Sequence, residues 1–445
     1  MRLQLTERSQ AQSPAAGDGP KGGIAAALAA ATASLLATAG GASAAVAQEA
    51  TGGKWDFDLA LHSYRETDRV NDASGTFLVR RGRGGGGEFR LLFTIDTLTG
   101  ASASGAVPAA RAQTFTSPSG KAYYTTPAGT IPLDPTFLDT RVALAANMVQ
   151  PLGRFSEVDF GLSVSSEWDY LHTGVNANYT RDFNERRTTF TLGVAFARDT
   201  IDPEGGAPLP LAPMLPVGAL GNKAGSDDKT VTDFLIGVTH VLGRNTIGQL
   251  NYSLSVADGY LTDPYKLLSV VDRATGEPAP GPGDLDLYLF ESRPDSRTKH
   301  SLFALWKHSL GRDVVDLSYR YMTDDWKIDS HTVELRYRWD LGSFDLQPHV
   351  RYYTQSAADF YRGALFAGDP VPQFASADYR VGELDTYTVG LAFGRPLANG
   401  QRLSLRLEYY EQSGTSPPEL AAGSLRDFDL APSVDALIAE VGFRW

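Results

Sequence analysis

The 445-residue sequence contains no cysteine. This absence excludes a disulfide framework, Cys-based zinc and iron–sulfur sites, a thiol nucleophile and the acceptor of a lipoprotein anchor. Beyond the first 47 residues there is no run of about 18 apolar residues, which excludes a helical membrane protein. The net charge of -12 argues against a nucleic-acid-binding protein. One membrane class remains, the transmembrane β-barrel, because its alternating strands average to a polar composition.

The N-terminus has the features of a secretory signal. Lys21 precedes a run of small apolar residues over 22–39, and Ala45-Val46-Ala47 has the small-x-small pattern that a signal peptidase cleaves. We therefore expect a signal peptide over residues 1–47 and a single mature domain over 48–445.

The mature chain repeatedly alternates apolar and polar residues. At 332–340, for example, Val333, Leu335, Tyr337 and Trp339 alternate with polar residues, three of them charged in mid-strand. Alternation places one face of a strand in an apolar medium and the other in a polar one. Many runs reach the 9–11 residues or so that a tilted strand needs to cross a bilayer, which favours a membrane barrel over a β-sandwich.

The spacing of these runs predicts an all-β fold, a transmembrane antiparallel barrel of about sixteen strands. The expected strands are 54–65, 75–83, 87–99, 138–150, 155–166, 168–180, 187–199, 229–242, 246–258, 297–310, 313–323, 328–340, 344–356, 381–395, 400–412 and 432–445. Short turns alternate with longer connections, a pattern typical of outer-membrane barrels with short periplasmic turns and long outer loops. The long loops 100–137 and 259–296 either fold inward to constrict the barrel or project outward.

The last strand ends on Trp445, with Phe443 two residues earlier and apolar residues at every second position back to Leu437. An aromatic terminus on an alternating strand resembles the signal that the bacterial barrel assembly machinery recognises. We expect Phe443 and Trp445 to serve this role.

Several segments resemble domain-of-unknown-function family 3570, an uncharacterised family of bacterial envelope proteins. The most specific are Tyr319-Arg320-Tyr321, residues 323–326 (Thr-Asp-Asp-Trp), Ser330-His331-Thr332 and residues 351–361. The resemblance covers essentially the mature chain and implies an outer-membrane β-barrel of a Gram-negative bacterium. It also implies a neighbourhood of genes for a thioredoxin-like protein, a small lipoprotein and a flavin transferase, and hence extracytosolic redox or metal-related work.

An acidic group in one short outer connection is the first candidate site. It comprises Asp324, Asp325, Asp329 and His331. Such a group either binds a divalent cation or works as a hydrolytic Asp/His pair. The alternative is a tight hairpin whose carboxylates cap backbone N–H groups while Trp326 anchors at the outer interface.

Charged residues on the polar face of several strands are the second candidate, and we expect them to line the lumen. They are Arg320, Glu334, Arg336, Arg338, His349, Arg351, Tyr353, Arg406 and Glu408. They either select anionic solutes or seat a plug or partner, or they neutralise one another through cross-strand ion pairs.

The functional hypothesis that follows is a channel or conduit of porin size for small solutes, ions or a redox partner. The alternative is a non-conducting scaffold plugged by loops or a small lipoprotein, in an electron-transfer or metal-related assembly. A minor alternative is an outer-membrane hydrolase.

The sequence lacks the His-Glu-x-x-His and Gly-x-Ser-x-Gly motifs, and we expect no enzyme activity and no cofactor. The expected partners are outer-membrane lipid, the barrel assembly machinery and a periplasmic lipoprotein or redox protein.

Overall fold

The computed structural model describes residues 53, 55–67, 69–416, 423–431 and 433–445. The predicted signal peptide, residues 1–47, lies outside the described residues. No helix in the described part of the chain has the length and apolar character needed to cross a membrane.

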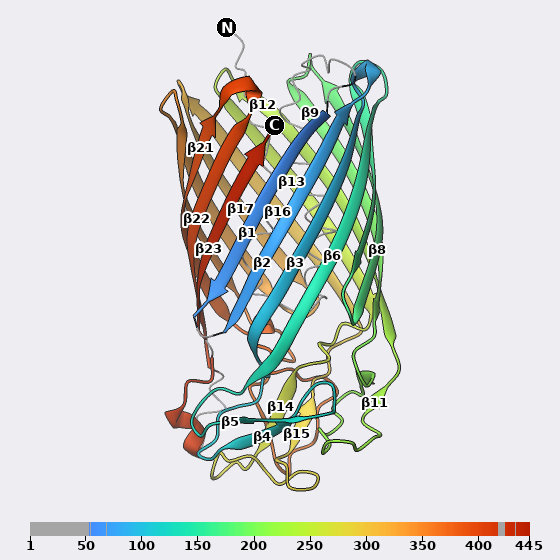
Figure 1. Ribbon diagram of the computed structural model, residues 1–445, viewed down its shortest axis with the longest axis vertical. Helices are drawn as coiled ribbons and strands as arrows, with labels where there is room; N and C mark the ends of the chain where they lie inside the picture. The colour runs from blue at the N-terminus through green and yellow to red at the C-terminus, as the bar shows by residue number, and fades with distance from the viewer. Residues whose placement is uncertain (1–52, 54, 68, 417–422, 432) are drawn as a thin grey trace.

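Sixteen strands form one closed antiparallel barrel, in which each strand pairs with its neighbours in chain order and β23 closes on β1 (Figure 1). These strands are β1 (Trp55–Glu66), β2 (Val70–Gly82), β3 (Glu88–Ala103), β6 (Leu133–Pro151), β7 (Ser156–Ser166), β8 (Tyr170–Phe183), β9 (Thr188–Ile201), β12 (Asp227–Gly243), β13 (Thr246–Gly259), β16 (Ser296–Leu310), β17 (Asp313–Asp324), β18 (Asp329–Asp340), β19 (Asp345–Gln355), β21 (Leu384–Pro396), β22 (Arg402–Gly414) and β23 (Val434–Arg444). The predicted all-β class and the number of strands are confirmed.

The alternation in the sequence explains which face of each strand points outward. On β18, Leu335 and Trp339 are 46% and 45% exposed on the outer face. The intervening residues of that strand point to the inner side, because successive side chains of a strand alternate between its faces. An apolar outer face and a charged inner face are what a barrel in a lipid bilayer requires.

Several strands are longer than the sequence pattern indicates. Strand β2 begins at Val70 rather than residue 75, and β6 begins at Leu133 rather than 138. Both extensions continue the pairing with the preceding barrel strand, since Asn71 lies opposite Arg65 of β1 and Leu133 opposite Ala103 of β3. Backbone pairing continues past the last residues whose side chains alternate in polarity.

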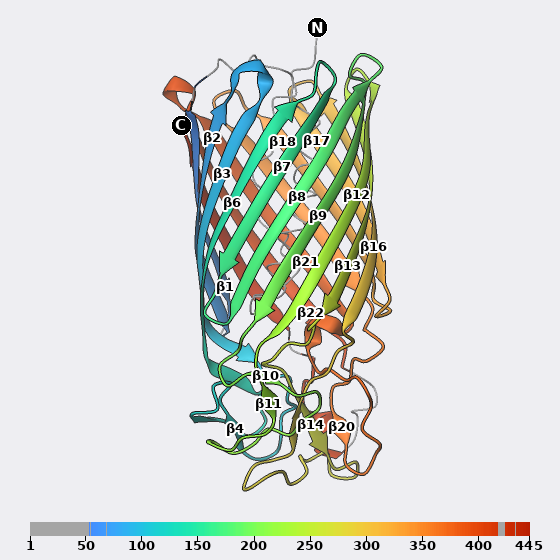
Figure 2. The ribbon, with the colours of Figure 1, turned by 90° about the vertical axis from the view of Figure 1, so that its right-hand side faces the viewer.

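The two ends of the barrel differ. One end carries only short turns, those after β2, β6, β8, β12, β16, β18 and β21, together with the C-terminus. The long connections gather at the other end, beside the short turns after β1, β7 and β17 (Figure 2). There they form a folded cap, defined here as residues 104–132, 202–226, 260–295 and 356–383. Both of the long loops whose direction the sequence left open contribute to this cap, beyond the end of the barrel (Figures 1 and 2).

Three small sheets organise the cap. They are β4 (Gln113–Thr116) with β5 (Tyr123–Thr126), β10 (Ala207–Pro208) with β11 (Lys223–Ala224), and β14 (Leu267–Val271) between β15 (Tyr288–Phe290) and β20 (Leu365–Phe366). Strand β14, in the connection after β13, pairs in parallel with β20, in the connection after β19. This pairing joins two connections that are distant in sequence. Buried aromatic rings support this arrangement, with the centroids of Phe115 and Tyr288 4.6 Å apart.

Candidate functional site

All nine predicted lumen residues point to the inner side of the barrel, since each has the opposite parity to the exposed apolar residues of its strand. They lie on four strands, β17, β18, β19 and β22, of which the first three are adjacent. The structure thus brings them together on one sector of the wall. Within this set, five arginines and one histidine face two glutamates, so the sector carries excess positive charge.

His349 links the two glutamates of this sector. Its Nε2 lies 3.2 Å from Oε1 of Glu334, and its Nδ1 lies 3.2 Å from Oε1 of Glu408. Strand β21 separates His349 from Glu408, and the residue between them in register is Gly390. A Cβ at this glycine would lie 2.5 Å from Cγ of Glu408, so the glycine lets the glutamate reach across.

Ion pairs neutralise part of this sector. Arg336 pairs with Glu334, and Nε of Arg406 lies 3.8 Å from Glu408. Arg320 instead places its guanidinium 5.5 Å from the ring of Phe303. Cross-strand neutralisation, one of the two alternatives drawn from the sequence, therefore accounts for the glutamates. Beyond the predicted set, Asp316 lies opposite Arg336 and Glu440 lies opposite Arg406, so further acidic residues line this part of the wall.

The predicted acidic group is divided between the two faces of the wall. Asp324 points inward, where its carboxylate accepts from Nε of Arg297 at 2.8 Å and from the backbone N–H of Ile328 at 2.9 Å. His331 faces outward, with Nδ1 2.8 Å from the hydroxyl of Tyr319, and Asp329 accepts from Tyr321 at 2.8 Å on the same outer face. The backbone N–H of Asp325 donates to Thr298 at 3.2 Å. The structure therefore does not bring Asp324 and His331 together as a pair.

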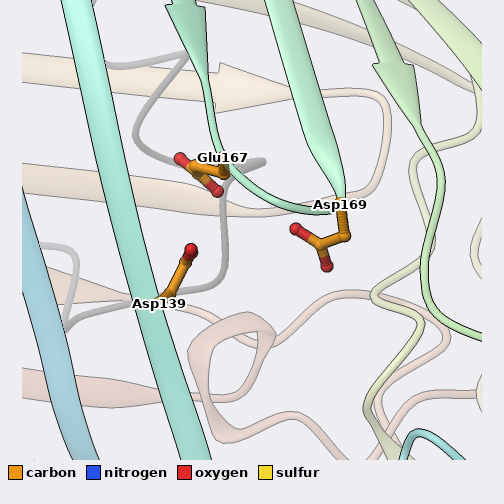
Figure 3. Close-up of side chains that lie close together, drawn as sticks. All are labelled: Asp139, Glu167 and Asp169. Carbon is orange, nitrogen blue, oxygen red and sulfur yellow. The ribbon is translucent and has the colours of Figure 1, made fainter.

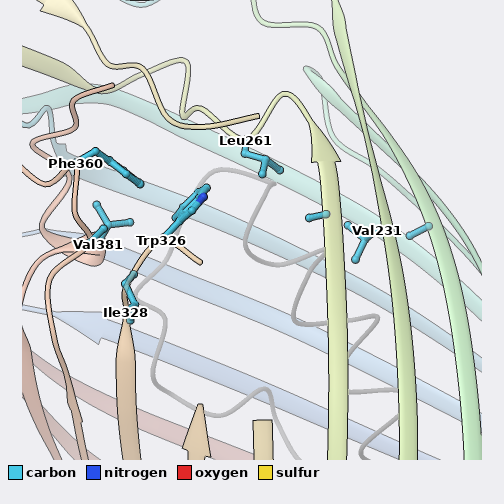
Figure 4. Close-up of a cluster of buried hydrophobic side chains, with 9 residues drawn as sticks. Val231, Leu261, Trp326, Ile328, Phe360 and Val381 are labelled. Atoms are coloured by element: carbon cyan, nitrogen blue, oxygen red, sulfur yellow. The ribbon is translucent and has the colours of Figure 1, made fainter. Parts of the chain in front are cut away.

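Trp326 does not anchor at the lipid interface, contrary to one alternative from the sequence. It is 4% exposed, and it belongs to a cluster that joins the wall of β9, β12 and β13 to the connections after β13, β17 and β19 (Figure 4). The members of this mouth cluster are Ala197, Val231, Ala257, Leu261, Trp326, Ile328, Ala358, Phe360 and Val381. The ring of Trp326 meets Phe360 edge-on at 5.0 Å, and its indole N–H donates to Ser296 at 2.8 Å. These side chains place part of the cap over the mouth of the barrel.

A network of buried charges holds two cap connections together. Asp378 accepts from Nη2 of Arg293 at 2.7 Å and from Nε of Arg380 at 2.6 Å, and Arg380 also pairs with Asp263. Although burial opposes ionisation, the two arginines hold the pKa of Asp378 well below its usual range. This carboxylate is therefore charged at any physiological pH.

Lys266 belongs to the same network and is 5% exposed. Its ammonium group donates to the backbone carbonyl of Ala103 and lies 3.3 Å from Oγ of Ser102, at the end of β3. Burial lowers the pKa of this lysine. The network thus fastens the cap to the rim of the barrel.

Three carboxylates that sequence analysis did not connect meet beside the rim (Figure 3). Asp139 on β6 and Glu167 and Asp169 in the β7–β8 turn offer oxygen atoms within 4.8 Å of one another. This is the group of described residues whose spacing suits a metal ion. Burial, reinforced by the Asp139 charge, raises the pKa of Glu167 to about 9, and burial raises that of Asp169 to about 6 in spite of its hydrogen bond from Tyr265. Carboxylates this close together share protons at neutral pH, because like charges at short range oppose full ionisation.

A second unpredicted group lies on the inner wall of β7, β8 and β9. Oγ of Ser163 lies 3.2 Å from Nε2 of His172, whose Nδ1 lies 2.6 Å from Oδ1 of Asp199. His172 and Asp199 are 3% and 1% exposed. No sequence motif signals this group, because its members are joined by strand pairing and not by spacing along the chain.

The aromatic C-terminus lies at the short-turn end. The rings of Phe443 and Trp445 stack at 5.6 Å, and Trp445 also stacks on Phe57 of β1 at 5.5 Å. The last strand thus contributes to an aromatic cluster at the seam where β23 meets β1.

The closed sixteen-stranded barrel, its apolar exterior and its charged interior define an outer-membrane-type β-barrel. The chain belongs to the family described as "Protein of unknown function (DUF3570)", whose model matches residues 25–445. The family resemblance drawn from the sequence is therefore confirmed. No curated protein matches the chain.

Several solved structures align with this chain at low similarity. A bacterial polysaccharide outer membrane secretin aligns with 10% identity and a TM-score of 0.43, over 89% of this chain and 99% of its own. The outer membrane protein opdK from Pseudomonas aeruginosa aligns with 11% identity and a TM-score of 0.39, over 88% and 98%. The siderophore receptor PirA from Acinetobacter baumannii aligns with 10% identity and a TM-score of 0.40, over 83% of this chain. The alignment spans 55% of that receptor.

Proposed function

We propose that this protein is an outer-membrane channel or conduit for small solutes or ions, with a preference for anions. The observation that carries the proposal is the charged sector on β17, β18, β19 and β22. Five arginines face two glutamates inside a barrel whose outer surface is apolar. Within this set the positive side chains outnumber the negative ones, and an excess of one sign of charge concentrates solutes of the opposite sign.

Conductance of the purified protein in planar bilayers tests this proposal. We expect ion conductance with anion preference, and we expect Arg351→Gln to lower the anion-to-cation permeability ratio about twofold or more. Arg312→Gln is the matched control, because Arg312 is exposed on a short turn and pairs with Asp340 at 2.9 Å. A correctly folded protein that conducts no ions contradicts the channel proposal.

The cap supports a second candidate, a scaffold closed to ions that holds a periplasmic lipoprotein or redox protein. The mouth cluster and the buried charge network place ordered chain over the barrel mouth. Co-purification from native membranes distinguishes the two candidates. A stoichiometric partner together with absent conductance favours the scaffold, and conductance of the isolated chain favours the channel.

A further inference from the structure

We propose that Ser163, His172 and Asp199 form a nucleophilic site that hydrolyses short-chain carboxylic esters. The inference goes beyond a channel or scaffold and does not depend on either. It also departs from the expectation, drawn from the absence of known motifs, that the chain is not an enzyme. The site differs from the Asp/His pair considered from the sequence, whose members lie on opposite faces of the wall.

The three side chains contact one another in the sequence serine, imidazole, carboxylate, which is the arrangement that activates a serine. A serine hydroxyl becomes nucleophilic when a neighbouring imidazole takes its proton and a carboxylate orients the other ring nitrogen. Here Nε2 of His172 lies 3.2 Å from Oγ of Ser163, and Nδ1 lies 2.6 Å from Oδ1 of Asp199. With the Nδ1–H tautomer, His172 donates to Asp199 and accepts the hydrogen bond of Ser163.

Strand register creates this alignment. His172 lies directly opposite Asp199 in the β8–β9 pair, and Ser163 lies opposite Gly174 in the β7–β8 pair. His172 and Gly174 are successive inward-facing residues of β8, so the imidazole reaches the serine diagonally. All three side chains lie on rigid, fully paired strands, which keeps their geometry constant.

Asp199 is prepared to orient the imidazole. Its side chain is 1% exposed, and its second oxygen, Oδ2, lies 3.3 Å from Nζ of Lys229. The ammonium group compensates the buried carboxylate charge, and Oδ1 remains directed at His172. Asp199 is thus a positioning residue, whereas Ser163 and His172 are the candidates for contact with a substrate.

Gly174 allows the two reactive side chains to come together. A Cβ at this position would lie 2.6 Å from Oγ of Ser163 and 3.0 Å from Nε2 of His172. Any other residue would therefore crowd both the nucleophile and the base. The absent side chain lets the hydroxyl of Ser163 and the imidazole of His172 meet above this glycine.

A donor for the developing oxyanion lies on the same strand. Asn176 is the next inward-facing residue after Gly174, and it lies opposite Gly161, two positions from Ser163. Within the described part of the chain, its Nδ2 is buried and has no hydrogen-bond partner. The amide of Asn176 lies over Gly161, and an amide N–H turned from there towards Ser163 would stabilise the oxyanion of a tetrahedral intermediate.

The reaction balances with water as the second reactant. Ser163 gives its proton to Nε2 of His172 while Oγ bonds to the ester carbonyl carbon. His172 passes this proton to the leaving alkoxide as the C–O bond breaks, which releases the alcohol and leaves the acyl group on Ser163. Water then gives a proton to His172 and attacks the acyl carbon, Ser163 regains its proton, and the carboxylic acid leaves.

The surrounding wall indicates the substrate class. The inward-facing neighbours on β7 and β8 are small or polar, and those on β9 include Gly193, Ala195 and Ala197. No long apolar groove for a fatty acyl chain is formed by these residues. We therefore choose a short acyl group such as acetyl as the acyl part of the substrate.

The experiment uses the full mature barrel, folded in detergent, with p-nitrophenyl acetate as substrate and a fluorophosphonate as active-serine probe. We expect hydrolysis of the ester and covalent labelling of Ser163, located by peptide mass spectrometry on the unmodified sequence. Ser163→Ala should abolish labelling and lower the rate about 100-fold or more. Ser253→Ala is the matched control, because Ser253 is a half-buried, inward-facing serine on β13, away from His172, and it should retain both signals.

Asp199→Asn tests the positioning role. We expect kcat to fall with KM nearly unchanged, and the pH–rate profile to change, which a merely structural role would not produce. The proposal is overturned by absent hydrolysis and labelling in the folded protein, by labelling at another residue, or by full activity of a folded Ser163→Ala variant. Since the label is mapped on the unmodified sequence, failure of a variant to fold does not prevent the test.

Discussion

At the scale of single residues, the space around a glycine and the charges around a carboxylate explain why particular side chains meet. Gly390 allows Glu408 to reach His349 across an intervening strand, and Gly174 allows Ser163 to meet His172. The buried carboxylate of Asp378 lies next to cations, whereas the half-buried carboxylates of Glu167 and Asp139 lie next to one another. The second arrangement has a measurable consequence for stability.

We predict that the Glu167 group makes the protein less stable as the pH rises. The pKa of Glu167 is raised from 4.5 to about 9, and that of Asp169 from 3.8 to about 6. The folded state therefore binds more protons than the unfolded state, and stability present below about pH 4.5 is lost as the pH rises towards 9. Thermal unfolding followed by circular dichroism between pH 5 and 9 measures the effect. Glu167→Gln should raise Tm at pH 9 by several degrees and change it little at pH 5.

Glu185→Gln is the control for this prediction, because Glu185 is an exposed glutamate on a short turn. It should leave the pH dependence of Tm unchanged. Equal Tm differences between Glu167→Gln and the unmodified protein at both pH values would contradict the assignment.

At the scale of elements, the strands follow from the sequence but their register does not. The alternation of apolar residues places β8 and β9 nearly correctly, yet a turn predicted at 181–186 would pair His172 with Ala195. The observed turn pairs Phe183 with Thr188 and so brings His172 opposite Asp199. Period-two alternation is unchanged by a shift of two residues, so it determines the face of a residue and not its neighbour.

The cap connections are also elements whose packing the sequence does not reveal. Trp326 has the sequence context of an interfacial residue, because it lies in a short turn between two alternating strands. Its ring is nevertheless buried against Phe360, which lies in the connection after β19. This contact leads to a second prediction.

We predict that Trp326→Ala loosens the cap from the barrel mouth. Removing a buried tryptophan costs about 3–5 kcal/mol, and this loss should fall mainly on the connection 356–383, which packs on the ring. Trypsin cleavage at the exposed Arg362 should then increase more than tenfold. Trp168→Ala is the matched control, since Trp168 is 57% exposed in another rim turn. Equal cleavage rates in the two variants would refute the anchoring role.

At the scale of the whole molecule, the barrel is asymmetric in two ways. Its two ends differ, and so do two sides of its wall. One end carries short turns and the C-terminus, and the other carries the cap. The arginine-rich sector occupies the β17–β22 side, and the Ser163 group lies on β7, β8 and β9. A channel and a wall-mounted hydrolytic site can therefore coexist in one barrel.

We predict that the cap faces the cell exterior and that the short turns face the periplasm. The absence of native cysteine makes single-cysteine labelling direct. A membrane-impermeant maleimide should label Ala274→Cys in the cap of intact cells, whereas Ser343→Cys in a short turn should react only after lysis. Both positions are exposed, so accessibility in the folded chain is matched. The reverse labelling pattern would invert the proposed orientation.

The sequence by itself determined the fold class, the number of strands, the face of each alternating residue and the inward position of the charged sector. Each of these depends on local period-two alternation and on the lengths of connections, which are present in the chain before it folds. Only the tertiary structure decided which inward residues meet, as in Ser163 with His172 and Asp199. It also decided that distant connections form one cap. These contacts arise from strand register and from packing between segments far apart in sequence, and neither is encoded in a local pattern.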